Sequence, residues 1–249
     1  MILPRRIVCG VFLSAFITTA AIAQSSDDST PTRFTVGGSF IISQPKEEFR
    51  QNVGNGYGGG GSVMYHLLRS GLLSLRFDGS GVVYGKETKR VPFSETVGSR
   101  ILVDVTTTNW IADFSFGPEL AVPSGWVRPY AGVAYSRLLF RTTSTISGTR
   151  SSEEPIASTT NFSDGTGAWV YSGGLRVPFG RRSPVSLDVG LRYHRGGNAS
   201  YLREGSILDH PDGSITIFPL SSKTPFLVYS FGVQFRIPHG SGPCSSFLC

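Results

Sequence analysis

The sequence is poor in the residues that build most metal and cofactor sites. It has three cysteines in 249 residues, and only Cys244 and Cys249 remain if the N-terminus is removed as a signal peptide. These two form no metal-type cluster, although they can pair as a small disulfide loop in an oxidising compartment. The glycine run at 58–61 is not followed by the Gly-Lys-Ser/Thr of a phosphate-binding loop. We therefore expect neither a cofactor nor a metal, and assign no catalytic or ligand-binding residue.

Long apolar runs are also missing after residue 23, so we expect no transmembrane helix. The mostly apolar stretch 7–22 follows Arg5 and Arg6 and ends in Ala21-Ile22-Ala23, a small-x-small cleavage pattern. This predicts a cleaved signal peptide over residues 1–23. A retained anchor and a twin-arginine signal are alternatives, but the run is short for a span and a membrane barrel is not folded cargo. We therefore expect general secretion.

A strong charge imbalance is absent as well. The formal net charge of +6 falls to +4 without Arg5 and Arg6, and both signs are spread along the chain. This excludes the basic patch of a nucleic-acid-binding protein. Helix formers are sparse, whereas glycine (31 residues), valine, phenylalanine, tyrosine, threonine and serine dominate the regular stretches, which favours strands. We predict eight strands, at about 33–43, 55–67, 72–84, 101–120, 127–141, 166–178, 185–194 and 225–237.

Most of these strands alternate an apolar face with a polar one. In 72–84, Leu75 and Phe77 oppose Arg76 and Asp78, as in a membrane barrel with a polar interior. Strand 101–120 changes phase, which predicts a bulge near Thr108-Asn109 or a part extending beyond the lipid. Aromatic residues near the strand ends suggest interfacial girdles: Phe34, Tyr57, Tyr84, Trp110, Phe116, Trp126, Trp169, Phe179 and Tyr193.

The predicted links alternate in length along the chain. Those at 68–71, 121–126 and 179–184 are short, whereas those at 44–54, 85–100, 142–165 and 195–224 are long. Outer-membrane barrels place tight turns in the periplasm and long loops outside. The pattern predicts an all-β fold: an eight-stranded antiparallel up-and-down transmembrane β-barrel with short periplasmic turns and long extracellular loops.

The chain resembles the OmpA-like family of small eight-stranded outer-membrane barrels. The resemblance is carried by the signal ending at Ala23, by the segments 128–133 and 190–193, and by the closing strand 229–236. It implies a bacterial outer-membrane location and insertion by the barrel-assembly machinery, which reads a last strand ending in an aromatic residue. The chain departs from that pattern, because Phe235 is followed by Arg236, Ile237 and a tail. The domains expected are a signal peptide (1–23), a flexible segment (24–32), the barrel (33–237) and a C-terminal tail (238–249).

An eight-stranded barrel is filled by its own side chains, so inward charges should pair with one another. We expect this of Arg76, Asp78, Asp113, Glu119, Arg128, Arg176, Asp188 and Arg192. The alternative is that they line a narrow ion path. A soluble secreted barrel holding an apolar ligand is another, and would show the opposite orientation, with apolar residues inside.

The segment 195–224 is the richest in polar residues. His194 at its base and Ser200 suggest a lipid-modifying enzyme, like a lipid A deacylase, if a carboxylate orients the pair. A turn at 209–214 resembles a calcium loop but lacks its closing Glu, so a β-turn explains it better. We expect a non-enzymatic protein with a structural or surface-interaction role through its extracellular loops. The expected partners are outer-membrane lipids and lipopolysaccharide, with an unknown loop partner and no nucleic acid.

Overall fold

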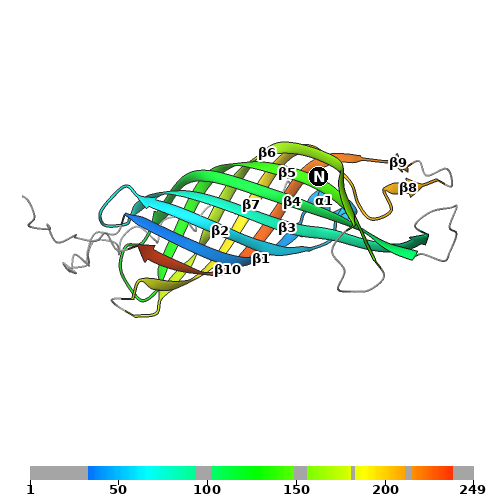
Figure 1. The fold of residues 1–249 in the computed structure, drawn as a ribbon. Helices are drawn as coiled ribbons and strands as arrows, with labels where there is room; N and C mark the ends of the chain where they lie inside the picture. Colours follow the sequence, from blue (N-terminus) through cyan, green and yellow to red (C-terminus); the bar gives the residue numbers. More distant parts are fainter. Residues whose placement is uncertain (1–32, 93–101, 149–155, 181–182, 211–214, 238–249) are drawn as a thin grey trace, which may run out of the picture.

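Eight long strands close into one antiparallel barrel (Figure 1). The computed structural model describes residues 33–92, 102–148, 156–180, 183–210 and 215–237. The predicted signal peptide, the segment 24–32, the tail 238–249 and its two cysteines therefore lie outside the described residues. The barrel strands are β1 (Phe34–Pro45), β2 (Gly56–His66), β3 (Leu73–Pro92), β4 (Leu102–Ala121), β5 (Arg128–Gly148), β6 (Ala157–Pro178), β7 (Val185–Tyr201) and β10 (Leu220–Ile237).

Consecutive strands pair all the way round, and β1 pairs with β10 from Phe34↔Ile237 to Pro45↔Phe226 to complete the ring. This is the predicted eight-stranded up-and-down topology. A separate hairpin joins β8 (Ile207–Asp209) to β9 (Ile215–Ile217) within the predicted link 195–224. Closure leaves the wall without an edge strand, which is the arrangement that lets a sheet lie in lipid.

The wall is apolar outside and polar inside over its lower half. Phe77, Phe116 and Phe231 are about half exposed, whereas Asp78, Glu119 and Asp188 are buried. This orientation contradicts the soluble barrel with an apolar ligand inside. Most of the predicted girdle residues point outward, but Tyr84 does not: it is buried, and its hydroxyl donates to the Leu202 carbonyl at 3.0 Å.

The strands end where predicted at one rim and extend further at the other. At the rim formed by the links after β2, β4 and β6, boundaries agree within a residue or two. At the opposite rim, β3 continues to Pro92, β5 to Gly148 and β7 to Tyr201, while β6 begins at Ala157. Much of the predicted loops 85–100, 142–165 and 195–224 is therefore strand. The short–long contrast between the two rims is smaller than the sequence suggested.

The phase change predicted in β4 is not a bulge of β4. Val103, Asn109, Ile111 and Asp113 are all buried at odd positions, so the strand keeps one phase throughout. The apparent switch arises because the inner face turns from apolar near the long-loop rim to polar below it. The register shift at this level lies on the neighbouring strand, between Val83 and Gly85.

The inner face near the long-loop rim is sealed by an apolar layer. Its centre is Phe49 on the short helix α1 (Glu47–Asn52), which lies within the predicted link 44–54. The Phe49 ring packs edge-on against Tyr201 at 5.1 Å and Phe140 at 6.1 Å, and also contacts Phe226. Lys46 N–H donates to the Pro225 carbonyl at 2.9 Å, and Asn52 Nδ2 to the Tyr201 hydroxyl at 3.2 Å, which fix the helix across the opening. No described helix is long and apolar enough to cross a membrane.

Candidate functional site

The predicted interior charges meet in one network near the short-turn rim. Arg76 lies 2.9 Å from both Asp78 and Glu119 and 3.9 Å from Asp188. Arg176 bonds the second oxygen of Glu119 at 2.5 Å. Each of these side chains is nearly buried, so the pairing offsets a desolvation cost that a lone charge could not meet.

The network extends across the lumen through further partners. Arg192 lies 3.3 Å from Asp78, and the Gln234 amide donates to Asp188. The guanidinium of Arg176 lies over the Tyr130 ring at 4.2 Å, a cation–π distance. Arg128, which was also predicted to be an interior charge, is partly buried at the short-turn rim, and its Nε donates to the Gly125 carbonyl at 3.3 Å.

Asp113 pairs with His194, which the sequence placed at the end of predicted strand 185–194, at the base of the polar segment 195–224. His194 Nε2 lies 3.1 Å from Asp113 Oδ2, and the Ser136 hydroxyl donates to the other oxygen of Asp113. The imidazole stacks on Phe226 at 4.3 Å and is completely buried. In a catalytic triad the histidine lies between the carboxylate and the serine. Here Asp113 lies between His194 and Ser136, so the imidazole cannot act as a base for the Ser136 hydroxyl.

The structure does not bring His194 and Ser200 together as an enzyme site requires. His194 points into the barrel, whereas the Ser200 amide donates to Asp164 Oδ2 at 2.6 Å near the rim. At the calcium-like turn, residues 211–214 lie outside the described part of the chain, and His210 Nε2 contacts the Thr216 hydroxyl at 2.8 Å. No group of three His, Cys, Asp or Glu side chains in the described ranges is placed to hold a metal.

Above the barrel, four strands continue as a protruding sheet made of the upper parts of β3, β4, β5 and β6. The β2–β3 ladder ends at Tyr57↔Val83 and the β6–β7 ladder at Ala168↔Gly196, but β3–β4–β5–β6 stay paired beyond these points. Cross-strand hydroxyls join the sheet: Thr88 to Thr106 at 3.0 Å and Thr107 to Ser144 at 2.8 Å. The sheet thus has two edges, one on β3 and one on β6.

The two edges differ in charge. The β3 edge carries Lys86, Glu87, Lys89 and Arg90, and Arg90 bonds Asp104 at 2.8 Å. Its Lys86 and Glu87 also contact the loop at Glu204 and Gly205. The β6 edge, residues 157–163, carries no charge and pairs on its outer side with no described strand.

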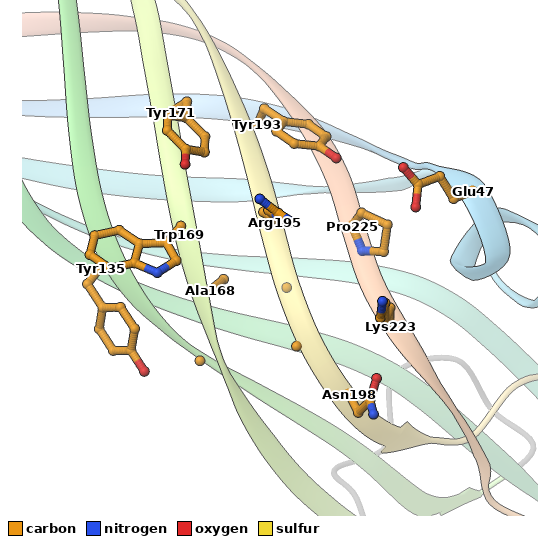
Figure 2. Close-up of a pocket in the computed structure, with 13 residues that line it drawn as sticks. Glu47, Tyr135, Ala168, Trp169, Tyr171, Tyr193, Arg195, Asn198, Lys223 and Pro225 are labelled. Atoms are coloured by element: carbon orange, nitrogen blue, oxygen red, sulfur yellow. The ribbon is translucent and has the colours of Figure 1, made fainter.

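A groove of about 1130 Å³ lies on the outer wall where β6 and β7 part (Figure 2). Gly196 and Gly197 form part of its floor, and Thr224 closes the back by donating to the Gly197 carbonyl at 3.0 Å. A Cβ at Gly196 would lie 2.3 Å from the Thr224 carbonyl oxygen, so only glycine fits this close approach. Aromatic and polar side chains line the groove: Tyr135, Trp169, Tyr171, Tyr193, Arg195, Asn198, Lys223 and Glu47.

Sequence reasoning missed this groove, although it recognised Trp169 and Tyr193 as girdle residues. The groove forms from four strands, β5, β6, β7 and β10, together with α1, and the sequence alone does not show how these elements align. The available signal was the basic residue that closely follows the aromatic positions on β5 and β7: Arg137 after Tyr135, and Arg195 after Tyr193.

Residues 12–210 match the sequence model of a family described as "Outer membrane protein beta-barrel domain". Comparison with curated proteins found no match.

Twenty-eight solved chains resemble the fold. The attachment invasion locus protein Ail of Yersinia pestis, solved with the heparin analogue sucrose octasulfate, is 10% identical with a TM-score of 0.42, covering 83% of this chain and 99% of Ail. Neisserial surface protein A is 15% identical with a TM-score of 0.41, covering 82% and 97%. OprG from Pseudomonas aeruginosa is 12% identical with a TM-score of 0.38, covering 85% and 98%. At these identities the likeness is one of fold alone.

Proposed function

This chain belongs to the outer membrane protein β-barrel family, a family of the bacterial outer membrane, and we propose that it is a non-enzymatic surface protein that pairs its β6 edge with an extended strand of a partner. The observation that supports this most directly is the uncharged edge at 157–163, which pairs on its outer side with no strand in the described ranges. An exposed strand edge presents a row of backbone donors and acceptors to a second chain.

The proposed orientation puts the protruding sheet outside the cell. Both ends of the barrel, Phe34 and Ile237, lie at the short-turn rim, which in this class of barrel faces the periplasm. The sheet then projects from the opposite rim into the surroundings. In this orientation the barrel-assembly machinery inserts the chain, with the last strand β10 completing the ring beside β1.

The contrast between the edges favours β6 over β3 as the contact site. Charged side chains on an edge strand oppose pairing with another strand, and the β3 edge has four of them within five residues. The β6 edge instead presents Ser158, Thr159 and Thr160, which are all exposed. Threonine also has high strand propensity, which favours the extended conformation that pairing with another strand requires.

The interior gives no support to the lipid-hydrolase alternative. Its candidate base, His194, is completely buried between Asp113 and Phe226 and shares no contact with Ser200. The narrow-channel alternative is disfavoured by two filled layers, the charge network and the apolar layer around Phe49. We therefore propose a structural barrel wall with a binding edge.

The edge can be tested with peptides selected from a phage-displayed random library against the full-length protein in lipid nanodiscs. Thr160→Lys puts a charge on the β6 edge and should abolish binding of the selected peptides. Thr88→Lys is the matched control, because it makes the same exposed change on the opposite edge of the same sheet. The bound peptide should also slow hydrogen exchange of the amides at 157–163. Equal binding by both variants, or protection confined to other segments, would refute the proposal.

A further inference from the structure

The groove between β6 and β7 aligns an aromatic row with basic residues at one level of the wall. Tyr135 is the register partner of Trp169, Trp169 of Arg195, and Arg195 of Pro225. Tyr135 and Trp169 meet edge to face, with ring centroids 5.6 Å apart. In a membrane protein, tryptophan and tyrosine mark the level of the lipid headgroups. Arg195 therefore lies at headgroup depth rather than in open water.

The basic residues of the groove are available for an external anion. Arg195 and Lys223 are exposed, and neither forms an ion pair with any residue in the described ranges. Arg137, exposed on β5 opposite the groove residue Gly167, is near the Asp164 carboxylate, so within the described ranges the groove's free basic side chains are those of Arg195 and Lys223. Glu47 is the acidic lining residue, and it enters from α1 at one edge (Figure 2). The local balance is thus positive.

The lower part of the groove suits hydrocarbon. Tyr171 on β6 and its register partner Tyr193 on β7 lie two residues nearer the short-turn rim than Trp169 and Arg195. Figure 2 shows the rings of Tyr171, Tyr193 and Trp169 around Arg195. A ligand that fits both parts has an anionic head and long apolar chains. Its head would lie between Arg195, Lys223 and Asn198, and its chains along the aromatic row.

We propose that this groove binds the phosphorylated sugar headgroup of lipopolysaccharide from the outer leaflet. The inference rests on the proposed orientation, because only then does the groove open at the outer surface. Phosphate is the acceptor that arginine and lysine pair with most strongly, and clustered basic side chains at headgroup depth hold anionic lipids. The site lies on the wall below the β6 edge and does not involve it.

Native mass spectrometry of the full-length protein in detergent micelles can measure binding of bisphosphorylated lipid A. The double variant Arg195→Gln/Lys223→Gln should bind about thirtyfold more weakly, as expected for two basic side chains near an anionic lipid surface. Arg50→Gln/Arg203→Gln is the matched control, since both residues are exposed near the same rim and neither lines the groove. This control should bind like the native protein.

Binding of other ligands in the same experiment identifies the molecule that the groove binds. Dephosphorylated lipid A and inorganic phosphate should each bind far more weakly than the intact lipid, because each lacks one half of the ligand. Equal binding of phosphatidylglycerol would replace lipopolysaccharide with anionic lipid in general and overturn the proposal, as would equal loss in the control variant. Heat-modifiable mobility of every variant shows that the barrel has formed. The lipid A experiment can therefore fail without changing the result of the β6-edge experiment. The β6-edge experiment can likewise fail without changing the lipid A result.

Discussion

Gly58 shows how closely two strands approach inside this barrel. A Cβ built at Gly58 would lie 1.8 Å from the Gly81 carbonyl oxygen, which is backbone and cannot rotate away. We predict that Gly58→Ala destabilises the folded barrel by about 3 kcal/mol, because β2 and β3 must separate to admit the methyl group. Urea unfolding of the refolded protein, followed by tryptophan fluorescence, measures the change.

Gly81 supplies the control for this substitution. It belongs to the neighbouring strand at almost the same level, but a Cβ there would meet nothing within 4 Å. Gly81→Ala should therefore leave the unfolding midpoint nearly unchanged. If both variants lose the same stability, the cost comes from strand propensity or lipid contact rather than from the close approach. No phosphate-binding motif follows the glycine run 58–61 in the sequence, and the close approach at Gly58 gives a packing reason for glycine at that position.

The interior charges were predictable as a set, whereas their pairing was not. Alternation alone indicated that Arg76, Asp78 and Glu119 share the inner face. The register between strands decides that Glu119 serves both Arg76 and Arg176. The predicted strand ended at His194 because polar residues follow it, whereas β7 continues for seven more residues to Tyr201, and the His194 imidazole is buried inside.

The helix α1 shows what a short element can contribute through one side chain. Phe49 is buried against three aromatic rings from β5, β7 and β10. We predict that Phe49→Ala lowers stability by about 3–5 kcal/mol, through lost burial and the cavity left behind. The same change removes the centre of the apolar layer, so conductance across planar bilayers should rise above that of the native protein.

Glu48→Ala separates the loss of the ring from damage to the helix. Glu48 is exposed on the same helix, so its truncation should alter neither stability nor conductance. Raised conductance in both variants would mean that α1 itself, rather than the Phe49 contacts, closes the outer end. Unchanged conductance in Phe49→Ala would show that the charge network below is sufficient to block the lumen.

Strand boundaries were predictable at the short-turn rim because one face of each strand there is apolar and the other is polar. Near the short turns each strand alternates apolar and polar residues and stops at a turn. In the proposed orientation the upper parts of β5 and β6 lie above the membrane, where both faces meet water, and they contain serine and threonine on both sides. A period-two pattern cannot be seen in such segments, and they were assigned to loops. The helix α1 was missed because its six residues fold against a tertiary contact at Phe49.

At the scale of the whole molecule, the pairing of β1 with β10 that closes the barrel leads to a prediction about membrane insertion and gel mobility. β1 and β10, the first and last strands, pair over twelve positions, so the wall forms only when the chain is complete. We predict that the full chain fractionates with the outer membrane and that unheated and heated samples migrate differently on gels. A chain ending before Leu220 lacks β10, leaves β1 and β7 each without a partner on one side, and should lose this difference. A full-length protein that stays soluble, or a truncated chain that keeps the heat-dependent shift, would contradict the transmembrane barrel. The comparison tests closure itself, because both chains carry the same β1–β7 wall and differ in the strand that joins its two edges.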